Sequence, residues 1–96
     1  MQAFTFNQRV ENLYKSYFST FENISISLDE DQIKIYLIDE QNLDPASLEL
    51  KKFKQYDQIT IWDGYSQSEV IETTSERESA KTLKRFMKKL LKILNR

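Results

Sequence analysis

The side chains that could do chemistry in this 96-residue chain are carboxylates and cations, because it contains neither cysteine nor histidine. It therefore has no thiolate nucleophile, no imidazole acid or base and no disulfide, and it lacks the nitrogen and sulfur ligands that zinc prefers. The single glycine cannot build a phosphate-binding loop of the glycine-rich type. Fifteen acidic residues remain, so carboxylate chemistry is what the composition leaves open.

The carboxylates come nearest to a catalytic pattern at Glu49-Leu50-Lys51, with Asp39 or Asp44 upstream. This spacing resembles the acidic-plus-lysine motif of the restriction-endonuclease-like nucleases, in which carboxylates hold magnesium beside a lysine. That family has a helix between its core strands, and the short gaps in this chain leave no room for one. We therefore expect an exposed strand with alternating charges here, and a protein without catalytic residues, metal site or cofactor.

Two segments repeat apolar residues at the three- and four-residue steps of an amphipathic helix. The first runs from about Phe6 to Glu22. Thr5 and Gln8 form a capping box before it, and Asn23 is the expected left-handed end. The second helix covers about residues 76–95.

Between the helices, apolar residues alternate with polar ones, as they do in strands with one buried face. We expect residues 24–28 and 33–37 to form a hairpin, around either a two-residue loop, Glu30-Asp31, or a slightly longer turn, since Glu-Asp is not the preferred sequence for so tight a loop. With the two-residue loop, Leu28 pairs with Ile33, and the six aliphatic side chains of the two strands share one face.

Three further strands complete the pattern. One is expected near Leu48 to Lys54, with a bulge at Lys51-Lys52, and one contains Ile59 and Ile61. The turn signal Asp63-Gly64 leads to the last, Glu69 to Thr73. The order predicts a single α+β domain over residues 1–96, with a four- to five-stranded, mostly antiparallel meander sheet. Both helices lie on one face in two layers.

This arrangement leaves the other face of the sheet open. Tyr36, Ile38 and Trp62 are expected there on neighbouring strands, with Tyr65 beyond the turn. Exposed aromatic patches with polar rims are typical of protein interfaces, and on a sheet such rings can also stack nucleobases. We expect these four residues to anchor a protein partner or a homodimer. If a helix covers this face instead, they are ordinary core. The expected rim is the acidic turn of Asp29, Glu30 and Asp31.

Charge is strongly segregated along the chain. Residues 1–78 contain 15 acidic and 7 basic residues, whereas residues 79–96 contain seven cations and no acid. Such asymmetry suggests a polyanion-binding surface, although a solvated helix face, pairing with the acidic remainder or a membrane surface would also suit it. The candidate polyanion-binding residues in the second helix are Lys81, Lys84, Arg85, Lys88, Lys89 and Lys92.

These features predict a small non-enzymatic binding protein that acts through protein–protein contact, as an inhibitor, adaptor or accessory subunit. The alternative is a nucleic-acid-binding domain that uses the basic C-terminal helix. The longest apolar run has three residues, Tyr36-Leu37-Ile38, so no membrane span is expected. The N-terminus has no signal-peptide pattern, and a cytoplasmic location follows as the expectation.

Overall fold

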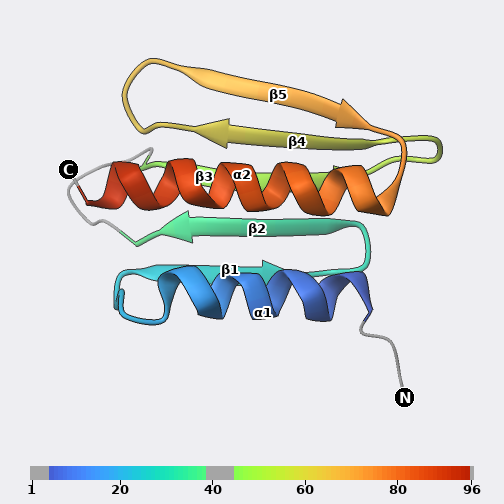
Figure 1. Ribbon diagram of the computed structural model, residues 1–96. Coiled ribbons are helices and arrows are strands. Elements are labelled where there is room, and N and C mark those ends of the chain that lie inside the picture. Colours follow the sequence, from blue (N-terminus) through green and yellow to red (C-terminus); the bar gives the residue numbers. More distant parts are fainter. Residues whose placement is uncertain (1–4, 39–44, 96) are drawn as a thin grey trace.

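The computed structural model describes residues 5–38 and 45–95. Its five strands form one antiparallel sheet in sequence order, and both helices lie on the same face of it (Figure 1). This confirms the predicted two-layer α+β architecture. The elements are α1 (Phe6–Phe18), β1 (Ile24–Leu28), β2 (Gln32–Leu37), β3 (Ser47–Lys52), β4 (Asp57–Trp62), β5 (Ser68–Thr73) and α2 (Glu76–Leu94).

The first hairpin has the predicted register. Leu28 pairs with Ile33 and Ile24 with Leu37. The backbone amide of Asp29 donates to the carbonyl of Gln32 at 2.8 Å, so the loop between them has two residues. The alternation of apolar and polar residues in β1 and β2 was enough to predict this register, because a shift of one residue would move every aliphatic side chain of a strand to the other face of the sheet.

Helix α1 is shorter than predicted and ends at Phe18. Ser19 closes it in the right-handed helical conformation, and the amide of Phe21 donates to the carbonyl of Phe18 at 3.0 Å. No described residue other than glycine has a positive φ, so the left-handed end expected at Asn23 is wrong. A tight turn reverses the chain before that residue is reached. The capping box of Thr5 and Gln8 is present as predicted.

The bulge expected at Lys51-Lys52 is also wrong. Both lysines continue the β3–β4 ladder, opposite Gln58 and Asp57 respectively. Lys52 occupies a helix-facing position, but it lies at the end of the strand. Its ammonium group reaches the ring of Phe6, 4.7 Å from the ring centroid. The long aliphatic part of the Lys52 side chain places the ammonium group at the edge of the core. The backbone of β3 can therefore pair regularly with β4 up to Lys52.

The turn at Asp63-Gly64 is longer than a two-residue hairpin. Trp62 pairs with Ser68, and the amide of Asp63 donates to the carbonyl of Gln67 at 3.1 Å. The Asp63 carboxylate accepts backbone N–H groups of the three residues before β5, at 2.8 to 3.1 Å. Gly64 has a φ of 86°, the left-handed conformation that glycine adopts readily.

The core lies between the helices and one face of the sheet. On α2, Leu83, Phe86, Met87 and Leu90 are all 0% exposed. Helix α1 packs on β1, and α2 packs on β3, β4 and the flank of β5. The two helices run side by side in the same direction (Figure 1). Neither of these described helices is long and apolar enough to cross a membrane.

Candidate interaction surfaces

Tyr36 and Trp62 lie on the open face of the sheet, as predicted. They belong to one cross-strand row with Ser47 between them. They are therefore not on neighbouring strands, which corrects the expectation of an adjacent pair. With strands about 4.8 Å apart, their backbones are separated by about 10 Å. Both side chains are half-buried.

Ile38 and Tyr65 lie at the same end of the sheet as this row. Ile38 follows β2, and its amide donates to the carbonyl of Asn23 at 2.7 Å. Tyr65 lies in the β4–β5 loop. Their side chains are 56% and 78% exposed, which is high for large apolar residues. We call the four residues Tyr36, Ile38, Trp62 and Tyr65 the aromatic end of the sheet.

The acidic turn lies at the opposite end of β2. Its backbone contacts α1 and β3 there: the Asn7 side chain donates to the carbonyl of Asp29 at 3.2 Å, and the Lys52 amide donates to the carbonyl of Asp31 at 2.8 Å. Asp29, Glu30 and Asp31 therefore do not border the aromatic end.

The nuclease-like triplet lies on β3, with Glu49 and Lys51 on the open face. Their side chains form an ion pair at 3.2 Å. Asp39 and Asp44 lie outside the described residues, and within residues 5–38 and 45–95 no three acidic side chains gather as a metal-binding group. The two charges alternate with Leu50 along the strand as expected, but the strand itself is not exposed, because β3 is the central strand of the sheet and Leu50 is buried in the core.

Five cations of α2, from Lys81 to Lys92, form a continuous exposed stripe. At about 3.6 residues per turn they fall within an arc of about 100°, and about 16 Å of helix axis separates the first from the last. All are exposed. We call the five residues Lys81, Lys84, Arg85, Lys88 and Lys92 the α2 ridge.

Lys89, the sixth predicted cation, lies on the flank of the helix and forms an ion pair with Glu69 of β5. This hydrogen bond from the Lys89 ammonium lowers the pKa of the Glu69 carboxyl group. Within the described part of the chain, none of the five ridge residues forms an ion pair. Ion pairing with the acidic part of the protein therefore explains the position of Lys89. It does not explain the five ridge residues, which have no ion pair in the described part of the chain.

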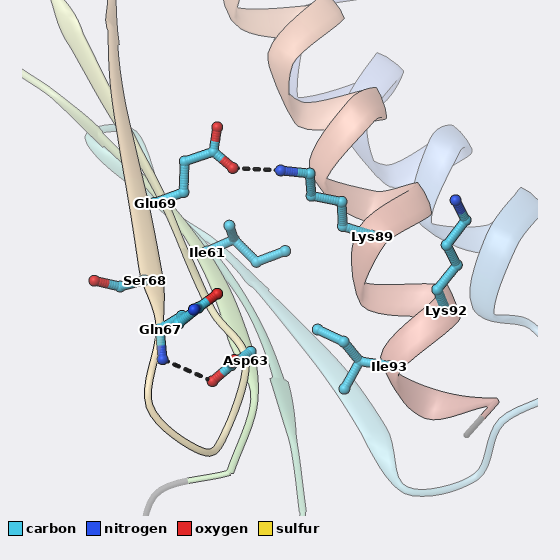
Figure 2. Close-up of a pocket in the computed structure, with 8 residues that line it drawn as sticks. All are labelled: Ile61, Asp63, Gln67, Ser68, Glu69, Lys89, Lys92 and Ile93. Carbon is cyan, nitrogen blue, oxygen red and sulfur yellow. Dashed lines mark hydrogen bonds and ion pairs between the residues drawn. The ribbon is translucent and has the colours of Figure 1, made fainter.

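A pocket of about 250 Å³ lies between the β4–β5 hairpin and the C-terminal half of α2 (Figure 2). Ile61 and Ile93 approach from its two sides, and Glu69 and Lys89 point toward one another across it. Lys92 stands on the helix wall. The pocket exists because α2 lies mainly over β3 and β4 and does not cover β5 fully (Figure 1).

Two features escaped the sequence analysis. Phe53 and Tyr56 stack at the tip of the β3–β4 hairpin, with ring centroids 4.9 Å apart. The third strand was expected to run through this tip, which hid the turn. Asp57, Thr73 and Ser79 form a hydrogen-bonded chain at one end of the core.

The hydroxyl of Ser79 donates to the Asp57 carboxylate at 2.7 Å and lies 2.5 Å from the hydroxyl of Thr73. Because a carboxylate only accepts, Thr73 must donate to Ser79. A serine beside a carboxylate suggests a nucleophile, but Ser79 is 0% exposed and cannot meet a substrate. This polar chain ties the start of α2 to β4 and β5.

No protein-family model, curated protein or solved structure matches this chain. Its function has to be inferred from the two surfaces described above, the α2 ridge and the aromatic end of the sheet.

Proposed function

We propose that this protein binds nucleic acid through the α2 ridge, and that it acts in the cytoplasm by binding and not by catalysis. One observation carries the proposal. Five exposed cations share one arc of a rigid helix, and none has an ionic partner in the described chain. Binding a phosphate backbone there would release counterions without first breaking internal ion pairs.

The length of the ridge suits a duplex. Double-stranded DNA carries about one phosphate per 1.7 Å of axis, so a ridge of about 16 Å meets enough phosphates for every cation. The ridge consists of lysine and arginine alone, which favours contacts with the backbone over recognition of particular bases.

Burial of α2 favours nucleic acid over a membrane surface. An interfacial helix inserts its apolar face among lipid chains. Here the centre of the apolar face of α2, including Phe86 and Leu90, is 0% exposed and packs in the core, and the apolar residues near its C-terminal end are half-buried. The charged face is the fully exposed part of the helix, and electrostatic attraction to phosphates is what it can supply.

A charge-reversal pair tests the proposal. In Lys81→Glu/Lys88→Glu, two ridge cations become acids at exposed positions, and duplex affinity should fall by roughly tenfold or more because fewer phosphates are neutralised. The matched control, Arg9→Glu/Lys54→Glu, makes the same change in net charge at exposed positions outside the ridge and should bind nearly as the unchanged protein does. Fluorescence anisotropy with a labelled duplex measures both. Equal losses in the two variants would contradict a ridge site.

A second candidate function, docking to another protein as an inhibitor, adaptor or accessory subunit, is favoured by the aromatic end of the sheet. Ile38 and Tyr65 expose large apolar side chains at the same end as Trp62. Trp62→Ala should abolish capture of a protein partner from the native host, while Tyr56→Ala, at the other end, should not. Unchanged capture by Trp62→Ala would remove this surface from consideration.

A further inference from the structure

The outer edge of β5 presents unpaired backbone groups. In an antiparallel pair, residues that bond the neighbouring strand alternate with residues that point away from it. The amide of Asp63 donates to the carbonyl of Gln67, so these two residues form a hydrogen-bonded pair. By the same alternation, the backbone groups of residues 69, 71 and 73 in β5 form hydrogen bonds with β4. The N–H and C=O groups of Ser68, Val70 and Glu72 point outward, and β5 is the last strand of the described sheet.

The opposite edge of the sheet is protected. In β1, the same alternation turns the backbone groups of Ile24, Ile26 and Leu28 outward. Helix α1 covers this strand, and the hydroxyl of Tyr14 donates to the carbonyl of Ile24 at 3.2 Å. Burial, with a smaller contribution from Tyr36, raises the pKa of Tyr14 above its ordinary value.

Strand β5 has only part of the protection that edge strands usually carry. It contains no lysine and no proline, and its pairing with β4 runs without a bulge from Ser68 to Thr73. Its two charged residues are Glu72 on the open face and Glu69 on the helix face, where Lys89 pairs with Glu69. At its centre, Val70 is 51% exposed on the open face of the sheet. A regular strand with an exposed valine and three outward-pointing residues is a template for another strand.

We propose that β5 pairs antiparallel with the β5 of a second copy of this chain, centred on Val70. In this register Val70 lies opposite Val70 of the second copy, and Ser68 lies opposite Glu72 in both directions. Every outward-pointing residue then meets another outward-pointing residue, so each of these pairs exchanges two backbone hydrogen bonds. The two sheets become one continuous sheet with a twofold axis perpendicular to it.

The side chains suit this register. On the open face, two valines meet at the axis and each Glu72 lies opposite a serine. On the helix face, Glu69 lies opposite Ile71. No glutamate directly opposes another glutamate, which avoids the destabilising like-charge pair. A second copy therefore complements the edge in hydrogen bonds and apolar contact, without placing like charges directly opposite one another.

Pairing of the two β5 strands also brings the pocket beside α2 close to the same pocket of the second copy. Both helical layers lie on the same face of the joined sheet, so the two pockets open toward each other. Glu69 of each copy lies between the two pockets, and Lys89 stands on each helix wall. This inference does not depend on the proposed nucleic-acid function, because it concerns a different edge of the molecule.

Proline substitution tests the pairing while leaving the fold intact. The Val70 amide points away from β4, so Val70→Pro removes no hydrogen bond within the chain, and proline is tolerated at such edge positions. Sedimentation velocity over a concentration series should show a dimer for the unchanged protein and for Val70→Thr. Self-association of Val70→Pro should be weaker by roughly tenfold or more, since the central pair of bonds is lost. A protein that stays monomeric throughout, or a Val70→Pro variant that dimerises equally, would overturn the proposal.

Disulfide trapping checks the register and does not depend on whether Val70→Pro folds. The chain has no cysteine, so a single Val70→Cys variant carries one thiol. Opposed residues of a hydrogen-bonded pair have Cα atoms about 5.5 Å apart, which a disulfide can span. Val70→Cys should therefore oxidise to a covalent dimer. Thr60→Cys, on the open face of neighbouring β4, should not, and preferential trapping there would indicate association through the sheet face and contradict pairing through β5.

Discussion

The ammonium group of Lys89 donates a hydrogen bond to the Glu69 carboxylate and so joins α2 to the edge strand β5 (Figure 2). This contact separates the cations of α2 into two groups. Lys89 is held within the molecule, whereas the five residues of the α2 ridge point into solvent without an ionic partner in the described chain. Within the described chain, the ion-paired and the unpaired cations therefore lie on different sides of one helix.

Glu69→Gln should reduce stability in a pH-dependent way. The hydrogen bond from Lys89 lowers the pKa of Glu69 below its ordinary value of 4.5. The contribution of the ionised Glu69 carboxylate to the free energy of unfolding is therefore fully present above pH 4.5. This contribution is lost as the pH falls through the lowered pKa of the folded state. Urea denaturation should show Glu69→Gln slightly less stable than the unchanged protein at neutral pH, with the difference vanishing in acid. A difference that is constant across the pH series would contradict this assignment.

Ser79→Ala should destabilise the fold without affecting surface binding. The substitution leaves the Asp57 carboxylate and the Thr73 hydroxyl without their shared partner, at a cost of about 1–3 kcal/mol. Chemical denaturation measures the loss. Because the residues form one hydrogen-bonded chain, Ser79→Ala/Thr73→Val should cost less than the sum of the two single substitutions. Strict additivity would show that the hydroxyl groups act independently.

Gly64→Ala should also destabilise the protein. Gly64 has a φ of 86°, and an added Cβ atom would lie 3.0 Å from the backbone nitrogen of Ala46. Left-handed conformation alone costs a residue with a side chain about 1–2 kcal/mol. Ser66→Ala, in the same loop, is the control and should leave the melting temperature nearly unchanged. Equal melting temperatures for the two variants would mean that the loop relaxes around the new methyl group.

Much of the fold could be predicted because it depends on local patterns. The alternation around Ile26 and Ile35 is sufficient for the first hairpin, since only one register buries both strands. Helix ends and loop lengths were harder to predict from the sequence. The end of α1 depends on a turn at Ser19 that no single residue type requires, and the side-chain bonds of Asp63 lengthen a loop that Asp-Gly alone would make short.

The α2 ridge was easier to predict from the sequence than the aromatic end of the sheet. Helical periodicity alone places Lys81 and Lys92 on one exposed arc. The predicted meander order already implies a strand between Tyr36 and Trp62, and in the structure Ser47 of β3 lies between them, so the expectation that they lie on neighbouring strands was inconsistent with that order. The pair between Lys89 and Glu69 depends on how α2 crosses the sheet, which no sequence period encodes. Placement of a helix over a sheet is a property of packing between distant segments.

The salt dependence of duplex DNA binding tests the nucleic-acid proposal most directly. Five ridge cations that each neutralise one phosphate predict a slope of about −4.5 for the logarithm of the binding constant against the logarithm of salt concentration. Affinity should then fall by roughly 500-fold between about 50 mM and 200 mM salt. Fluorescence anisotropy titrations at several salt concentrations measure this slope. Binding with a slope near zero, or no binding at low salt, would contradict a phosphate-binding role for the α2 ridge.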